Sequence, residues 1–117
     1  MGISTHILDT ATGAPAAEVP LALTRWHDGD WMLLQSTTTD AEGRCKQLLP
    51  EAVSSHGQRV EPGIYRLRFD TAAYYEAKGL VGLYPYVDVV FEAKPGEPHY
   101  HIPLLLTANG YTTYRGS

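Results

Sequence analysis

The sequence lacks the features that would stabilise it by disulfides or structural zinc, insert it into a membrane or direct it to secretion. It holds one cysteine, Cys45, which excludes an intrachain disulfide and a four-cysteine zinc site. Its longest apolar run is far shorter than the roughly 20 residues that a membrane-spanning helix needs. The opening MGISTHILDT is not a basic stretch followed by an apolar one, so no secretory signal is visible. These absences predict a soluble, cytoplasmic protein.

Basic clusters, internal repeats and linkers are missing as well. The net charge is −4 with no basic block, which argues against nucleic acid as a partner. The 117 residues are enough to bury one core and not comfortably two. We therefore expect a single domain over residues 1–117.

Helical periodicity is scarce, whereas strand and turn signals recur. Apolar side chains alternate with others over residues 19–23, 65–69 and 87–91, as they do in strands with one buried face. Asp28-Gly29 and Asn109-Gly110 are two-residue hairpin signals. Seven or eight short strands predict an all-β fold, an antiparallel β-sandwich.

One segment, TAAYYEAKG at residues 71–79, is the only good helix candidate. Asp70 or Thr71 would cap its start and Gly79 would end it. Two prolines fall inside strand-like runs, Pro20 and Pro103. Because proline cannot donate to a strand ladder, we expect both at edges or bulges.

The strand HYHIPLLLT places two histidines on one face. His99 and His101 share that face with Pro103, and alternation in the segment STHILD turns His6 outward as well. The opposite face of HYHIPLLLT carries side chains suited to a core: Tyr100, Ile102, Leu104 and Leu106.

Three interpretations of the histidines stay open from the residues alone. They can be surface or structural side chains, which is the usual case for such a pair. They can share a metal ion, with His6 as the third ligand. They can also serve in general acid–base catalysis, since histidine titrates near neutral pH.

Three segments together resemble one family, the 5-hydroxyisourate hydrolases, also called transthyretin-related proteins. They are STHILDTATGAPA, Gly43-Arg44, and HYHIPLLL followed by YTTYRGS. The terminal Tyr-Arg-Gly-Ser is the hallmark of that family. Transthyretin itself shares the fold but lacks the histidine pair and the tetrapeptide. The resemblance covers essentially the whole chain.

The resemblance implies a transthyretin-like sandwich of two four-stranded sheets with one short helix. It also implies a homotetramer, built as a dimer of dimers, with active sites in the channel between the dimers. The implied reaction is hydrolysis of 5-hydroxyisourate to 2-oxo-4-hydroxy-4-carboxy-5-ureidoimidazoline in urate degradation, without metal or cofactor. The alternative is a small-ligand carrier of the transthyretin type that does no chemistry.

Mapped onto this chain, the implied site divides into two overlapping groups. The expected catalytic residues are His6, Arg44, His101 and Ser117. The expected substrate-binding residues are His6, Arg44, His99, Tyr114, Arg115 and Gly116.

The residue types suit the hydrolysis of a cyclic amide. A neutral histidine can take a proton from water, and we favour His101 as this base with His6 orienting water or substrate. Arg44 offers a fork of donors for carbonyl oxygens or a ring anion. Ser117 offers a hydroxyl and, in this chain, a carboxylate.

Other residues are expected to have no part in the site. His27 and His56 lie in polar, turn-like segments and should be exposed. Tyr74 and Tyr75, in the helix candidate, should be packing residues. Cys45, next to Arg44, has no role that the sequence suggests.

Overall fold

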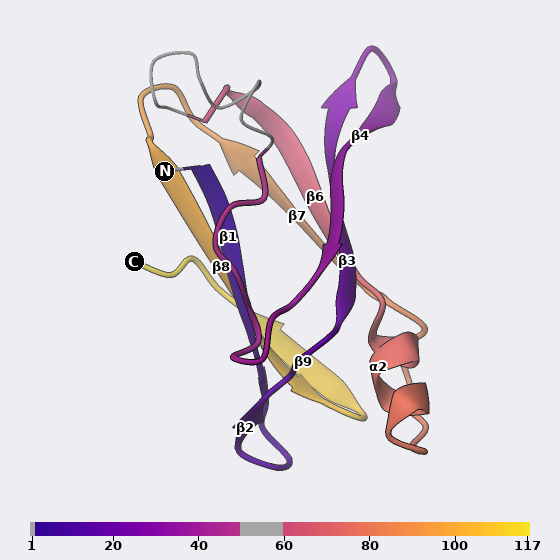
Figure 1. Cartoon of the computed structure of the whole chain (residues 1–117). Coiled ribbons are helices and arrows are strands. Elements are labelled where there is room, and N and C mark those ends of the chain that lie inside the picture. The colour runs from indigo at the N-terminus through magenta and orange to yellow at the C-terminus, as the bar shows by residue number, and fades with distance from the viewer. Residues whose placement is uncertain (1, 50–59) are drawn as a thin grey trace.

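Strands make up most of the regular structure in the computed structural model, which describes residues 2–49 and 60–117 (Figure 1). His56 lies outside the described residues. Within the described part there are nine strands and one helix, and no helix there is long and apolar enough to span a membrane. The elements are β1 (Gly2–Asp9), β2 (Ala14–Pro15), β3 (Pro20–His27), β4 (Asp30–Thr38), β5 (Arg44–Cys45), β6 (Gly63–Phe69), α2 (Thr71–Ala77), β7 (Val87–Ala93), β8 (His99–Thr107) and β9 (Gly110–Thr113).

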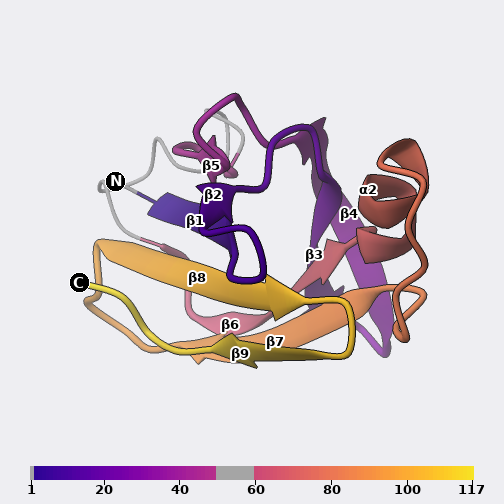
Figure 2. The same ribbon diagram turned by 90° about the horizontal axis from the view of Figure 1, so that it is seen from below.

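The strands form two sheets that face each other, as the view in Figure 2 shows. Sheet A has the order β2-β1-β8-β9, and sheet B has the order β4-β3-β6-β7. The expected sandwich is confirmed, with one addition. The two-residue strands β2 and β5 both pair with β1, so sheet A has five strands.

Sheet A contains the one parallel pair among the described strands. β1 runs parallel to β8 over its whole length, from Gly2 beside His99 to Asp9 beside Leu106. All the other described pairs are antiparallel. A parallel pair needs a long crossover, and here the chain passes through all of sheet B before it returns.

The core lies between the sheets and follows the alternation expected from the sequence. On β3 and β6 the buried hydrophobic side chains are Leu21, Leu23, Tyr65, Leu67 and Phe69, none more than 3% exposed. On β8 they are Tyr100, Ile102, Leu104 and Leu106. Each large apolar side chain that is fully buried contributes about 1.5–3 kcal/mol relative to its exposed state. These contacts fix which face of β8 points outward.

The hairpin predicted at Asp28-Gly29 is confirmed. His27 pairs with Asp30, so the loop between β3 and β4 has two residues. Asp28 has φ 53° and Gly29 has φ 82°, which is the pattern of a type I′ turn. Asp and Gly are the residues that tolerate this backbone best, which is why the sequence signal is reliable here.

The hairpin predicted at Asn109-Gly110 exists, but its turn lies one residue earlier. Thr107 pairs with Gly110, so the loop residues are Ala108 and Asn109. Neither has a positive φ. The Thr107 hydroxyl accepts a hydrogen bond from the Asn109 amide at 3.3 Å and donates to the Gly110 carbonyl at 3.1 Å. This side chain closes the turn without the left-handed backbone that Asn-Gly would supply.

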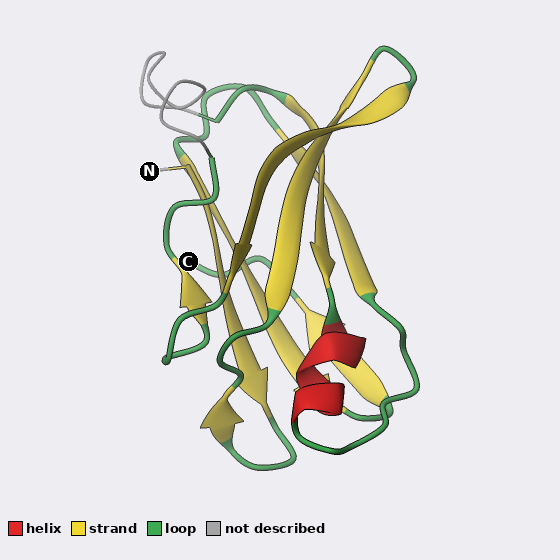
Figure 3. Cartoon of the chain, turned by 45° about the vertical axis from the view of Figure 1, so that its right-hand side comes forward, coloured by secondary structure: helices red, strands yellow, loops and turns green. Residues whose placement is uncertain are grey.

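Helix α2 lies at one end of the sandwich (Figure 3) and begins and ends as predicted. The Asp70 carboxylate accepts a hydrogen bond from the Ala73 amide at 3.0 Å, as an N-cap does. The chain leaves the helix through Gly79, whose φ is 70°. Local capping residues therefore set both ends of the only helix in the described part of the chain.

Tyr74 does more than pack, contrary to the expectation. Its hydroxyl donates a hydrogen bond to the carboxylate of Asp9 at 2.8 Å, and both side chains are buried. The other oxygen of that carboxylate accepts hydrogen bonds from two amides of the turn after β1. Tyr74 therefore joins α2 to sheet A through a buried charged group. The neighbouring Tyr75 is also buried, and its hydroxyl has no partner among the described residues.

Neither Pro20 nor Pro103 lies on an edge strand, which corrects the prediction made for these two residues. Pro20 is the first residue of β3, where a missing amide costs little. Pro103 lies in β8, between β1 and β9. The β8–β9 ladder ends at the pair Leu104–Thr113 and is resumed in the same register by Gly116 with His101. Pro103 lies in that gap, where its lack of an N–H interrupts the ladder.

Candidate active site

The strand register brings the predicted residues to one face of sheet A. The parallel pair β1–β8 sets Ser4 beside His101 and His6 beside Pro103. On the other edge of β1, Arg44 in β5 lies beside His6. Directly paired residues project from the same face of a sheet. His6, Arg44 and His101 therefore lie on the same outer face of sheet A, the face to which the sequence turned the two histidines.

The tail after β9 returns to the same face. The Gly116 amide donates a hydrogen bond to the His101 carbonyl at 2.8 Å. Figure 2 shows this last segment running along β8. The tetrapeptide 114–117 is thus tied to the histidine strand, and it brings Ser117 to the site.

These segments enclose a hollow with a cavity volume of about 360 Å³. Arg44, His99, His101 and Ser117 of the predicted site line it. The remaining lining residues are Ser4, Thr5, Cys45 and Lys46. One arginine, one lysine and two histidines therefore surround one space, which favours an anionic or carbonyl-rich ligand.

Ser4 links the two histidines of the hollow. Its Oγ lies 2.9 Å from Nε2 of His99 and 2.8 Å from Nδ1 of His101. Ser4 is only 7% exposed, so these bonds are shielded from water. Sequence reasoning missed this residue, although its position two before His6 on one strand places it on the same face.

Gly116 packs against the opposite edge of the His101 ring. A Cβ on Gly116 would lie 2.5 Å from Cδ2 and 3.2 Å from Cγ of that ring. Any side chain larger than hydrogen would collide there. The imidazole is therefore held between Ser4 at Nδ1 and the tail at Cδ2, while Nε2 makes no hydrogen bond within the described residues.

The turn before Arg44 explains why a glycine precedes it. Gly43 has φ 74°, and a Cβ there would lie 2.5 Å from the Ile7 carbonyl oxygen. The Asp40 carboxylate accepts a hydrogen bond from the Arg44 amide at 2.9 Å and closes the turn. No described side chain pairs with the guanidinium of Arg44. The turn therefore fixes the backbone of Arg44 and leaves the charge of its guanidinium available to a ligand.

The electrostatics of the hollow keep its histidines neutral. Burial lowers the pKa of His101 below its usual value of 6.5, and so does repulsion from His99 and His6 when they are protonated and from the charge of Arg44. Burial also lowers the pKa of His99. A histidine with a lowered pKa is unprotonated at neutral pH and can accept a proton.

Cys45 has the opposite character. It is buried, its Sγ donates to the Thr38 carbonyl at 3.3 Å, and burial raises the pKa of its thiol to about 11. It therefore stays protonated at neutral pH and is a poor nucleophile.

Lys46, two residues after Arg44, is an exposed residue of the hollow that sequence reasoning also missed. The same alternation that places Arg44 on the outer face would have identified it.

Arg115 is not brought to the hollow. Its guanidinium pairs with the Glu97 carboxylate at 3.2 Å and lies 4.5 Å from the centre of the Tyr100 ring. Tyr114 is 55% exposed and does not line the hollow either. In this chain Arg115 fastens the tail, and only the last two residues of the tetrapeptide touch His101 or the hollow.

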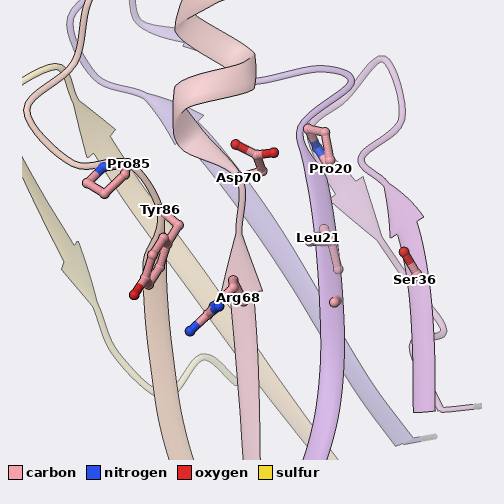
Figure 4. A pocket seen from close by; sticks show the side chains of 8 residues that line it. Pro20, Leu21, Ser36, Arg68, Asp70, Pro85 and Tyr86 are labelled. Atoms are coloured by element: carbon pink, nitrogen blue, oxygen red, sulfur yellow. The ribbon is translucent and has the colours of Figure 1, made fainter. Parts of the chain in front are cut away.

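A second hollow of about 380 Å³ lies on the outer face of sheet B near α2 (Figure 4). Its charged groups are already engaged: Arg68 binds Asp88 with two hydrogen bonds and stacks on Tyr86 at 4.0 Å. It holds no histidine or cysteine. His27, at the β3–β4 turn, is exposed as expected. The chemistry of the first hollow is not repeated here.

The metal hypothesis finds no support in the geometry of the described residues. Within residues 2–49 and 60–117, no three side chains of histidine, cysteine, aspartate or glutamate gather as a metal ion would require. His99 and His101 instead direct one nitrogen each toward Ser4.

Comparison with known proteins agrees with this arrangement. A family model described as the HIUase/Transthyretin family matches residues 3–116. The 5-hydroxyisourate hydrolase of Mus musculus is 42% identical over 98% of this chain and 94% of that protein. The 5-hydroxyisourate hydrolase of Salmonella dublin is 43% identical over 98% of this chain and 80% of that protein.

Solved structures give the same answer for the fold. Sea bream transthyretin in complex with thyroxine has a TM-score of 0.85 and 34% identity, over 97% of this chain and 93% of that one. Klebsiella pneumoniae 5-hydroxyisourate hydrolase has a TM-score of 0.80 and 31% identity, over 98% of both chains. On the family match, the identities and the shared fold, this chain belongs to the HIUase/Transthyretin family.

Proposed function

We propose that the chain is a 5-hydroxyisourate hydrolase, which opens a cyclic amide with water and so takes part in urate degradation. The observation that carries the proposal is the neutral imidazole of His101. It is held at Nδ1 by Ser4 and shares one hollow with the guanidinium of Arg44, which pairs with no side chain among the described residues. Relatives that are 42% and 43% identical bear the name of this enzyme.

In the proposed mechanism, water attacks a ring carbonyl carbon of the substrate. His101 takes the water proton at Nε2, a step that general base catalysis makes about 10²–10⁴-fold faster. Arg44 faces the oxyanion that develops on the carbonyl oxygen. A single preorganised donor of this kind contributes about 2.7–4 kcal/mol in a known hydrolase. The carbon–nitrogen bond then breaks, and the proton held by the histidine passes to the leaving nitrogen.

The other residues have supporting roles in this proposal. His6, next to Arg44 on the same face, orients water or substrate. Ser117 and His99 contact the substrate from the walls of the hollow. Tyr114 would reach the substrate only in an assembly, because in one chain it lies outside the hollow.

The proposal extends to assembly and location. Following the resemblance, we propose a homotetramer in which two copies of sheet A face each other across the hollow and restrict its water. A two-fold axis would pair equivalent sites across one channel. We also propose the cytoplasm, because the buried thiol of Cys45 suits a reducing compartment.

The test is a direct assay. Freshly generated 5-hydroxyisourate is mixed with the protein, and the decay of its ultraviolet absorbance is compared with spontaneous decay. The same assay is run on His101→Asn, which removes the proposed base. His27→Asn, at an exposed histidine of sheet B, is the matched control. Decay no faster than the spontaneous reaction would refute the proposal. Tight thyroxine binding together with absent hydrolysis would instead support the carrier function that the sea bream structure illustrates.

A further inference from the structure

The starting point is the hydroxyl of Ser4, which lies between two ring nitrogens. The distances of 2.9 Å to Nε2 of His99 and 2.8 Å to Nδ1 of His101 are both those of good hydrogen bonds. Ser4 is 7% exposed, and no other described residue receives its proton in a hydrogen bond. The hydroxyl therefore has these two rings as its partners.

Counting protons leaves two arrangements for this bridge. A serine hydroxyl has one proton to donate, and a neutral imidazole has one N–H and one bare nitrogen. Both rings could donate to the two lone pairs of Oγ, but the proton of the buried Ser4 hydroxyl would then have no acceptor among the described residues. When that proton is used as well, one ring donates to Ser4 and the other ring accepts from it. The direction of the bridge therefore fixes the tautomer of both His99 and His101.

The packing of His101 selects between the two arrangements. Nδ1 faces Ser4, and Cδ2 faces Gly116, so Nε2 is the nitrogen left for a substrate or water. A base must present a bare nitrogen, which requires the ring proton to be on Nδ1. The bridge then runs from His101 Nδ1–H to Ser4 Oγ, and from the Ser4 hydroxyl to Nε2 of His99.

We propose that Ser4 is a positioning residue, which holds His101 in the tautomer whose Nε2 is bare and uses His99 as the acceptor that orients its own hydroxyl. This inference rests on the proposed function. It also assigns His99 a role that needs no contact with substrate, and it explains why two histidines stand two residues apart on one strand. Ser4 itself touches neither the water nor the bond that breaks.

The first experiment reads the tautomer directly in the wild-type protein. ¹⁵N chemical shifts of the histidine rings are measured at neutral pH, where the lowered pKa leaves His101 neutral. We expect the signature of a protonated Nδ1 and a bare Nε2 for His101, and a bare Nε2 for His99. A protonated Nε2 on His101 in the resting protein would overturn the inference, whatever any variant does.

The second experiment uses two substitutions of Ser4. Ser4→Ala removes the bridge, and we expect kcat to fall about 10–100-fold, by analogy with the loss of groups that orient metal-binding histidines. KM should change less than about twofold, because Ser4 does not bind substrate. Ser4→Thr keeps a hydroxyl on a β-branched residue suited to a strand and should recover most of kcat. Equal kcat in wild type and Ser4→Ala would overturn the inference.

Failure of the inference differs from failure of the proposed function. A wild-type protein that hydrolyses 5-hydroxyisourate while Ser4→Ala is unimpaired contradicts only the role of Ser4. A wild-type protein that shows the expected tautomer but no hydrolysis contradicts the function, and the role of Ser4 in catalysis falls with it.

Discussion

Gly116 offers the sharpest test of the idea that the tail holds His101 in place. A Cβ added there would lie 2.5 Å from Cδ2 of His101 and 3.2 Å from Cγ of Pro103. Carbon atoms in contact normally lie about 3.5–4.0 Å apart, so something must move by about 1 Å. Because φ at Gly116 is not positive, the substitution Gly116→Ala introduces this collision without backbone strain.

Both ways of relieving the collision damage the proposed site. If the His101 ring moves, its 2.8 Å bond to Ser4 is lost. If the tail moves, the 2.8 Å bond from the Gly116 amide to the His101 carbonyl is lost, and Ser117 leaves the hollow. A misplacement of about 1 Å in a preorganised site can cost 10²-fold in rate. We therefore expect kcat/KM to fall about 100-fold.

The free energy of unfolding should change much less than the rate. Overpacking a core costs about 1–3 kcal/mol, and the tail can relieve the strain by detaching, so we expect no more than the lower end. Gly110→Ala is the matched control, because a Cβ there meets only the Thr107 hydroxyl at 3.6 Å and φ is again not positive. Absorbance assays measure kcat/KM of both variants, and urea titrations measure their free energies of unfolding. Wild-type kcat/KM in Gly116→Ala would refute the reasoning.

Three further predictions follow from the site and the fold. His101→Asn should lower kcat about 10²–10⁴-fold, since asparagine cannot take a proton at neutral pH; near wild-type turnover in stopped-flow assays would exclude His101 as the base. Burial and neighbouring positive charges lower the pKa of His101, so kcat/KM should fall with decreasing pH through a midpoint below 6.5. Arg44→Gln removes one of these charges and should raise that midpoint. A midpoint above 6.5 in the wild-type protein would contradict this prediction. Tyr74→Phe removes a hydrogen bond to the buried carboxylate of Asp9 and should cost about 1.5–3 kcal/mol of unfolding free energy in urea, with kcat unchanged.

The faces of the strands could be predicted because their signal is local. Two-residue alternation decides which side of β6 or β8 is buried, and burial of Leu67 and Leu104 confirms it. The helix was predictable for a similar reason, since Asp70 caps it and Gly79 ends it within a few residues. The turn at Thr107 was not, because its side chain replaced the left-handed backbone that Asn-Gly normally provides.

The candidate site was predictable as a set of residues but not as a geometry. The resemblance named His6, Arg44, His101 and the tail, whereas the bridge through Ser4 depends on the register of β1 against β8. No local pattern specifies that register, because all the strands of sheet B lie between β1 and β8 in the sequence. The direction of the Arg115 side chain could have been predicted, because strand alternation turns it to the face opposite Gly116 and away from the hollow.

The parallel pairing of β1 with β8 also has a consequence for how the protein folds. Ser4 and His101 are 97 positions apart, so the closure of a very long loop precedes any contact between them. Folds dominated by such distant contacts form slowly, in milliseconds to seconds. A nascent chain that has emerged only as far as β7 contains β1 with one edge unpaired and no part of the histidine strand. Hydrolytic activity should therefore appear as a late kinetic phase in refolding, after most β-structure has formed. Chaperones should bind the unpaired edge of β1 until β8 covers it.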